Sequence, residues 1–218
     1  ALFLQKCKPF CYNGSMTPAA IKITQTLSEA QQQQVGRLYF EAFQTKFTRL
    51  MHLPEDPAIS GSIFAETLNF DVGRYAVQGD QVLGGIGLVT GKEPFIHMTV
   101  GALRKHFAFF GAFLRAAGYW MLEFTNIKPK QDEVLIDAIF VSAESRGMGI
   151  GTQLLQHAEE YTRSIGRTKL ILGVIDSNDG AKRLYERFGY EVFKVERTGI
   201  FTASAGFRGA YAMRKVLD

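Results

Sequence analysis

The sequence is poor in residues that bind metals or form disulfides. It contains two cysteines, Cys7 and Cys11, among 218 residues. Two cysteines do not make the disulfide framework of a small secreted domain, and a zinc site would need further ligands near them. The four histidines do not have the spacing of metal ligands; they are His52, His97, His106 and His157. We therefore predict a cytoplasmic protein with reduced cysteines and no metal cofactor.

Long apolar runs and clusters of like charge are also missing. No run of roughly 18 apolar residues is free of charge, so the sequence predicts no membrane span. The apolar start from Ala1 to Leu4 is too short for a signal peptide. Lysines and arginines are scattered, and the net charge of +4 is mild. A weakly basic surface suits an anionic cofactor, and we expect neither a nucleic-acid partner nor a membrane partner.

The sequence contains enough apolar residues for a sizeable core. Hydrophobic residues make up 46% of the chain and charged residues 21%, a balance that argues against disorder. A length of 218 residues suits one domain with an elaboration. We expect a single domain over residues 16–218, because Met16 is a candidate natural start. Residues 1–15 show no clear periodicity and are interpreted as an N-terminal extension or appended segment.

A glycine-rich turn between a predicted strand and a predicted helix is the most informative stretch. The strand is the largely apolar run 134–141, and the helix follows from apolar residues at three- and four-residue steps after Ile150. The turn reads Arg146-Gly147-Met148-Gly149-Ile150-Gly151-Thr152. Glycines let a backbone approach a ligand, and free N–H groups at a helix N-terminus point at negative charge. With the positive charge of Arg146 at its mouth, the turn predicts a phosphate or pyrophosphate site.

Two common nucleotide fingerprints do not fit this turn. A P-loop would need a glycine, four residues, and then Gly-Lys-Ser or Gly-Lys-Thr, and the sequence has no such string. A dinucleotide fold would need G-x-G-x-x-G, whereas the glycines here run G-x-G-x-G. Asp176 lies 25 residues after Gly151, roughly where a ribose-binding acid would stand. A dinucleotide-binding enzyme therefore remains an alternative, which the glycine spacing disfavours.

The turn and a second stretch together resemble the GCN5-related N-acetyltransferase (GNAT) superfamily. The family's signature is Arg/Gln-x-x-Gly-x-Gly/Ala after a strand, which residues 146–151 match. Its second motif is Asn-x-x-Ala-x-x-Leu-Tyr-x-x-x-Gly-Phe/Tyr, which residues 178–190 match. A predicted buried strand, 169–175, lies between the two. The resemblance implies an α/β (α+β) fold with a mixed, mostly antiparallel sheet of six to seven strands flanked by helices.

The resemblance also implies acetyl-CoA as co-substrate and a set of residues that bind it. In the family, the fourth strand splays from the fifth, and the pantetheine arm lies between them. Phe140 and Val141 would supply backbone groups to this arm, one of them an N–H near the thioester oxygen. Residues Arg146 to Thr152 would bind the pyrophosphate. Asn178 matches a position that often bonds the pantetheine arm, although it could equally cap a helix.

Two residues are candidates for the chemistry of acetyl transfer. Tyr185 matches a tyrosine that, in many relatives, donates a proton to the cofactor sulfur, but it could also be a core residue of an amphipathic helix. Asp137 falls where many relatives carry a glutamate that acts as a base, directly or through water. Because a buried acid is costly unless paired, a structural salt bridge is the alternative role for Asp137. Glu133 is a second candidate for the base.

Residues 92–132 are the least expected part of the sequence. A minimal acetyltransferase would pass directly from its third strand to its fourth, whereas here an aromatic-rich stretch intervenes, which we expect to form one long or two short helices. This insertion would pack on its own sheet, close over the acceptor pocket or form a contact in a homodimer.

The resemblance implies an N-acetyltransferase with a primary amine of a small molecule or peptide as acceptor. Transfer would proceed by direct attack of the amine on the thioester in a ternary complex. An alternative is a non-catalytic acyl-CoA-binding or regulatory module on the same fold, because a fold does not fix a function.

Overall fold

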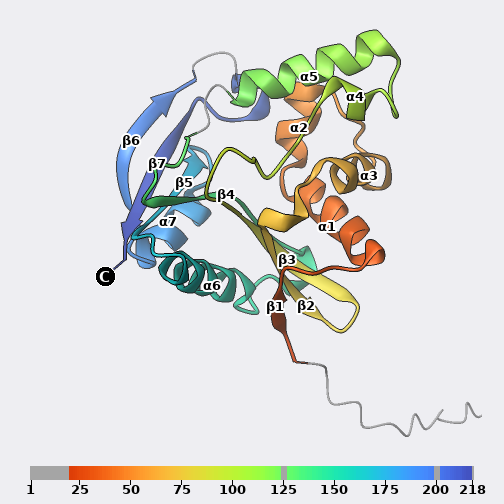
Figure 1. Cartoon of the computed structure of the whole chain (residues 1–218). Helices are drawn as coiled ribbons and strands as arrows, with labels where there is room; N and C mark the ends of the chain where they lie inside the picture. The colour runs from red at the N-terminus through yellow and green to blue at the C-terminus, as the bar shows by residue number, and fades with distance from the viewer. Residues whose placement is uncertain (1–19, 124–126, 199–201, 218) are drawn as a thin grey trace, which may run out of the picture.

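The protein is built around one seven-stranded sheet, which a computed structural model shows for residues 20–123, 127–198 and 202–217 (Figure 1). The strand order is β1-β2-β3-β4-β5-β7-β6. The strands are β1 (Lys22–Thr24), β2 (Gly73–Gln78), β3 (Gln81–Val89), β4 (Glu133–Val141), β5 (Lys169–Ile175), β6 (Glu191–Arg197) and β7 (Gly209–Val216). All neighbouring strands are antiparallel except β4 and β5, which are parallel. The prediction of a mixed, mostly antiparallel sheet is confirmed.

Helices cover both faces of this sheet. They are α1 (Glu29–Ala42), α2 (Gln44–Met51), α3 (Pro57–Thr67), α4 (Val100–Leu103), α5 (Phe109–Glu123), α6 (Ile150–Ser164) and α7 (Asp179–Arg187), with short 3-10 turns η1 (Phe70–Val72), η2 (Ala143–Ser145) and η3 (Ala203–Ala205). One apolar core joins α1, α2 and α3 to the sheet, and a second joins α6 and α7 to the opposite face. Figure 1 shows these two groups of helices on different sides of the strands.

Local sequence explains where several of these helices begin. Ser28 caps α1 as predicted: its hydroxyl accepts the N–H of Gln31, whose side chain accepts the N–H of Ser28 in return. Pro54 and Pro57 predict a break after the helix that ends near Leu53, and the break is present between α2 and α3; the prediction that the next helix starts at Ser60 was wrong. Asp56 is the N-cap of α3 and Pro57 is its first residue, because a first-turn proline gives up no helical hydrogen bond.

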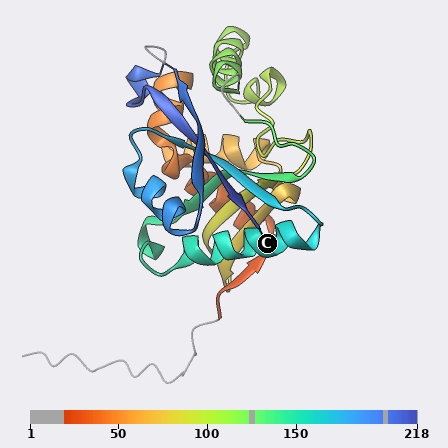
Figure 2. The same cartoon turned by 90° about the vertical axis from the view of Figure 1, so that its left-hand side faces the viewer.

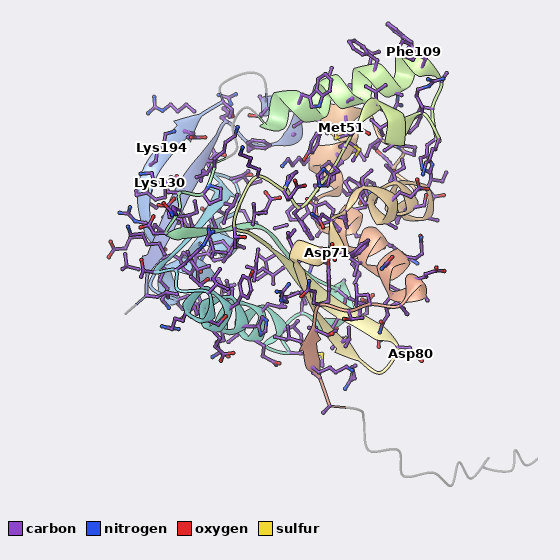
Figure 3. The ribbon with its side chains drawn as sticks, in the orientation of Figure 1. Met51, Asp71, Asp80, Phe109, Lys130 and Lys194 are labelled. Carbon is purple, nitrogen blue, oxygen red and sulfur yellow. The ribbon has the colours of Figure 1, made fainter. Side chains whose placement is uncertain are left out.

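The insertion between β3 and β4 forms two helices, α4 and α5. Helix α5 packs against α2 and α4 rather than covering the sheet, so the interpretation of a helix packed on its own sheet was wrong. Small side chains, Ala112 and Ala116, face inward, and α5 lies at the edge of the molecule (Figure 2). Figure 3 shows Phe109 at its outer end, where the side chain is exposed, whereas Met51 of α2 is buried.

Helices α1 and α3 approach each other closely through two glycines. A Cβ atom at Gly36 would lie 2.4 Å from the carbonyl oxygen of Gly61 and 2.5 Å from the backbone nitrogen of Ala65. A Cβ atom at Gly61 would lie 2.8 Å from the Cα of Arg37. Because the obstructing atoms belong to backbone, the helices must separate to admit a methyl group. This contact fixes α1, which carries one wall of the cavity described below.

We predict that Gly36→Ala destabilises the protein although alanine is the better helix former. Overpacking typically costs about 1–3 kcal/mol, more than the roughly 1 kcal/mol that alanine contributes to helix propensity. The matched control is Gly101→Ala in α4, where the nearest atom to an added Cβ is 3.7 Å away. Thermal denaturation should show a lower melting temperature for Gly36→Ala only; equal temperatures for both variants would contradict the close contact.

Candidate functional site

The two central strands separate part of the way along the sheet. Strands β4 and β5 pair from Glu133↔Lys169 to Ile136↔Leu172, whereas β4 runs on to Val141. On its other edge β4 stays paired with β3 as far as Val141. Beyond Ile136, one edge of β4 therefore faces away from any partner strand. The splayed arrangement that the resemblance implied is present.

A cavity of about 760 Å³ occupies the region where the strands separate. Its walls come from both apolar cores, so it extends from the α6–α7 side of the sheet to the α1–α2 side. On the α6–α7 side the wall includes Gly151, Asn178, Ala181, Leu184 and Tyr185. On the opposite side it includes Tyr39, Phe43, Phe47, Tyr119 and Phe207. Residues 137–141 of β4 lie between the two sets.

The N-terminus of α6 presents free backbone groups. Gly149 is the N-cap, with φ of +76°, and no side chain caps the first turn of this helix. Gly147 also has a positive φ, of +81°, and added Cβ atoms at these two glycines would meet nothing within 4 Å. Arg146 stands exposed beside them. Amide groups, open space and a positive charge make this helix start suitable for a phosphate group.

The four remaining members of the turn contribute differently. Ile150 is buried and anchors α6 in the core, whereas Met148 is exposed. Gly151 has an ordinary helical φ, and the nearest atom to an added Cβ is Val141 Cγ2 at 4.0 Å. The conformation therefore does not require glycine at residue 151, but a bare backbone there lets a ligand come close. Thr152, next in the first helical turn, is partly buried.

Two serines that the sequence analysis did not single out shape the approach to this turn. The hydroxyl of Ser142 donates to the Oγ of Ser145 at 2.9 Å and accepts the N–H of Ser145 at 3.2 Å. The N–H of Ser142 donates to the carbonyl of Leu83 at 2.8 Å. Both serines are buried. Only their spacing of three residues, typical of a hydroxyl that caps a turn, could have indicated this role.

Phe140 is held at the cavity wall by glycines of β3. An added Cβ at Gly85 would lie 2.6 Å from the Phe140 ring, and one at Gly84 would lie 2.5 Å from the Phe140 carbonyl oxygen. The close backbone approach predicted from the β3 glycines is therefore present. Phe140 and Val141 both line the cavity, on the segment of β4 that β5 no longer pairs.

Tyr185 lies on the α6–α7 side of the cavity and is 6% exposed. Burial raises the pKa of its phenol to about 12, because the low-dielectric surroundings disfavour the tyrosinate. The hydroxyl group therefore carries its proton throughout the neutral range. The side chain belongs to the core and to the cavity wall at the same time, so the two interpretations of Tyr185 do not exclude each other.

Asn178 is the N-cap of α7. Its Oδ1 accepts the backbone N–H of Ala181 at 3.1 Å, so the helix-cap role weighed for this residue is present. Asn178 also lines the cavity, which places its side-chain amide within reach of a molecule bound there.

Asp137 is the extra residue of a bulge in β4. Gly87 pairs with Ala138 and Leu88 pairs with Ile136, so Asp137 is the additional residue between two successive pairs. A bulge re-aims side chains, and Asp137 lies half-buried on the cavity wall. Its negative charge adds to the effect of burial in raising the pKa of Tyr39 well above its usual value. The sequence analysis treated Tyr39 only as part of an apolar helix face.

The other two acids considered from the sequence lie elsewhere. Glu133 is buried at the start of β4, where its Oε2 accepts the N–H of Lys130 at 3.0 Å, and it does not line the cavity. Asp176 accepts the N–H of Arg208 with both carboxylate oxygens, at 3.2 and 3.3 Å. Asp176 thus holds the loop that leads into β7, and the structure gives no support to a ribose-binding role.

The part of the chain that the structure describes contains neither a group of metal ligands nor a helix that could span a membrane. Within 20–123, 127–198 and 202–217, no three His, Cys, Asp or Glu side chains are grouped in a way that could hold a metal ion. Cys7 and Cys11 lie outside those ranges, as does the extension predicted for residues 1–15. Over the same ranges, every helix is too short or too polar to cross a bilayer.

Comparison with known proteins finds relatives by sequence and by fold. An uncharacterised N-acetyltransferase from Methanocaldococcus jannaschii is 42% identical over 67 residues, which are 31% of this chain and 29% of that protein. The thialysine N-epsilon-acetyltransferase of Bos taurus is 32% identical over 72 residues, 33% of this chain and 42% of that protein. The chain thus spans less than half the length of either curated relative.

Among solved structures, Ard1 from Thermoplasma volcanium aligns with a TM-score of 0.55 and 18% identity, over 92% of this chain and 99% of that one. At this identity the likeness concerns the fold alone. The model of the Acetyltransferase (GNAT) family matches residues 36–190, which is well over half of the chain. This match includes the glycine turn, both strands that separate and the α7 motif, and it shows that the chain belongs to the GNAT family of acetyltransferases.

Proposed function

We propose that the protein is an N-acetyltransferase that moves an acetyl group from acetyl-CoA to a primary amine. The observation that carries this proposal is the continuous cavity between β4 and β5. It connects a phosphate-compatible helix start and Tyr185 on one side with Asp137 and the α1–α2 wall on the other. A donor and an acceptor bound from opposite sides would meet in it, which favours direct attack in a ternary complex.

The cofactor would be held by groups from three elements. Amides and the guanidinium in residues 146–152 would bind the pyrophosphate. The unpaired edge of β4 at Phe140 and Val141 would hydrogen-bond the pantetheine arm, as a neighbouring strand would. The amide of Asn178 lies on the same wall. The fit is good because no side chain caps the first turn of α6 and because β5 does not pair with the segment of β4 that holds Phe140 and Val141.

The chemistry divides between two side chains. Asp137 would take a proton from the amine, directly or through water, as it attacks the carbonyl carbon of the thioester. A backbone N–H at Phe140 or Val141 would stabilise the charge that develops on the carbonyl oxygen. Tyr185 would donate a hydrogen bond, and finally a proton, to the departing sulfur.

The proton transfer in this last step depends on the pKa of the Tyr185 phenol relative to the pKa of the thiol of CoA. A phenol with a pKa of about 12 is a weak acid toward a thiolate whose conjugate acid has a pKa of ~8.5 in water. Burial disfavours thiolate and tyrosinate alike, so the same surroundings also raise the thiol pKa. We therefore expect Tyr185 to act chiefly by hydrogen-bonding the sulfur while negative charge develops on it.

A primary amine as acceptor is supported by the kind of relatives that the chain has. One is named for N-epsilon-acetylation of thialysine and another as an N-acetyltransferase, although the chain aligns with only part of each. A non-catalytic acyl-CoA-binding module is the second candidate. The placement of both Asp137 and Tyr185 in the lining of one cavity favours the enzyme, because binding alone requires neither group there.

We predict that Gly151→Asp weakens acetyl-CoA binding without harming the fold. The helical φ and free space at this residue admit a side chain, and an acidic group in the first turn of a helix is otherwise favourable. Next to a pyrophosphate, the same charge should raise the Kd for acetyl-CoA about tenfold or more, since tenfold corresponds to about 1.4 kcal/mol.

Gly151→Asn is the matched control for this charge, because it has nearly the same size. Calorimetric titration should show a much smaller increase in Kd for Gly151→Asn than for Gly151→Asp. Equal acetyl-CoA affinities for Gly151→Asp and the unmodified protein would contradict the assignment of the pyrophosphate site to residues 146–152. Gly149 is less suitable for the test, because its φ of +76° would add backbone strain.

We predict that Tyr185→Phe folds, binds acetyl-CoA and turns over roughly a hundredfold more slowly, within the range for the loss of a general acid. Removing the hydroxyl leaves the ring packing in place, so stability should change by no more than about 1 kcal/mol. Turnover is measured by release of CoA, and stability by thermal denaturation. Full activity would show that water or another group protonates the sulfur.

We predict that Asp137→Asn lowers turnover at neutral pH and leaves acetyl-CoA affinity nearly unchanged. Asparagine keeps the size of the side chain but cannot accept the proton of the amine. Glu133→Gln is the matched control outside the cavity and should keep its turnover. A variant Asp137→Asn that loses thermal stability but not turnover would instead identify a structural ion pair.

A further inference from the structure

The half of the cavity on the α1–α2 side has walls of large apolar side chains. Helices α1 and α2 and the residue between them supply Tyr39, Phe43 and Phe47. Tyr119 comes from α5, and Phe207 follows η3. Helix α2 packs against both α5 and η3, so segments distant in sequence enclose this half together (Figure 1).

Tyr119 gives the helical insertion a role at the site. It is 8% exposed, and its hydroxyl donates to the carbonyl oxygen of Ile96, which also lines the cavity, at 3.4 Å. The insertion therefore provides part of the wall on the α1–α2 side of the cavity, where the acceptor amine would bind. The structure supports the interpretation of α5 as a cover on this half of the cavity.

The charged groups on the same walls are mostly acidic. Three carboxylates line the cavity, at Glu41, Asp137 and Glu196, together with one ammonium group, at Lys46. Two of the carboxylates are bonded by cations from outside the cavity lining: Arg37 lies 2.9 Å from Glu41, and Lys194 lies 2.6 Å from Glu196. Asp137 lies on the β4 segment between the two halves of the cavity. A cationic amine is compatible with this arrangement.

We infer that the acceptor is a primary amine whose amino group is joined to a large apolar group, such as an arylalkylamine. This inference rests on the proposed function and specifies its acceptor. The apolar part would lie against the rings of Tyr39, Phe43 and Phe207, with the amino group directed at Asp137. A hydroxyl group in place of the apolar part would lie against these rings, where it would lose hydration.

Two amines with the same ethyl spacer test the inference, 2-phenylethylamine and ethanolamine. They differ only in a phenyl group against a hydroxyl group. One methylene group in an apolar pocket changes kcat/KM by about 10–200-fold. We therefore expect kcat/KM for 2-phenylethylamine to exceed that for ethanolamine by about a hundredfold or more, measured by CoA release and by mass spectrometry of the acetylated amine. Equal values, or a preference for ethanolamine, would overturn the inference.

A pair of variants assigns the preference to the cavity wall. Phe207→Ala should reduce the ratio of the two kcat/KM values at least tenfold, on the scale of a methylene or more lost from the pocket. Phe193→Ala is the matched control, because Phe193 is 43% exposed on β6 and does not line the cavity. The ratio of the two kcat/KM values does not change when a variant contains less active protein, because both values fall by the same factor. An unchanged ratio in Phe207→Ala would contradict the assigned wall.

Binding measurements separate failure of this inference from failure of the proposed function. Both amines are titrated calorimetrically into the protein saturated with CoA, which requires no turnover. If neither amine is acetylated but 2-phenylethylamine binds at least tenfold more tightly, catalysis fails as a proposal and the apolar acceptor site stands. If the two amines bind equally, the inference is wrong even where acetyl transfer is observed.

Discussion

The parting of β4 from β5 beyond Ile136 and Leu172 is the constraint on which the rest of the site depends. If the parallel ladder continued, the backbone groups on the edge of β4 that faces β5 would bond β5 beyond Ile136 as well, and no cavity would cross the sheet. An unpaired strand edge inside a protein is costly unless water or a ligand satisfies it. The edge of β4 toward β5 is unpaired beyond Ile136, whereas the edge toward β3 stays paired as far as Val141.

The cores on the two faces of the sheet give the cavity two different ends. On the α6–α7 face, the uncapped start of α6 and the exposed glycines offer amide groups to an anion. On the opposite face, α1, α2 and α5 offer aromatic rings, and α1 also offers the carboxylate of Glu41. The bulge at Asp137 lies between them and turns an acidic side chain onto the wall of an otherwise apolar strand. The ends of the cavity proposed for acetyl-CoA and for the amine therefore adjoin each other where the regular pairing of the sheet is interrupted.

Burial affects the phenol of Tyr185 in two ways. It keeps the phenol protonated, because the low-dielectric surroundings raise its pKa to about 12. It also makes proton transfer to a thiolate less favourable than hydrogen bonding. The same argument applies to Tyr39 on the opposite side, whose pKa is raised by burial and by the charge of Asp137. Both phenols are thus available as donors at neutral pH.

The sequence by itself determined the features that depend on neighbours in the chain. Hydrophobic periodicity placed the strands and helices around the glycine turn, and the spacing of Arg146 and the glycines after it predicted an anion site, because a turn and a helix start are local structures. The family motifs added the splayed strands and Tyr185. The start of α3 was placed three residues too late, because a proline that ends one helix and a proline that starts the next have the same local preference.

The tertiary structure alone decided which distant segments share the cavity. Tyr39, Tyr119 and Phe207 come from separate parts of the chain and meet only because α2 packs against α5 and η3. That Asp137 lines the cavity and Glu133 does not also depends on it, since both residues lie on β4. Periodicity reports which face of an element is buried. It does not report what that face meets, because packing between elements is set by the shape of the whole core.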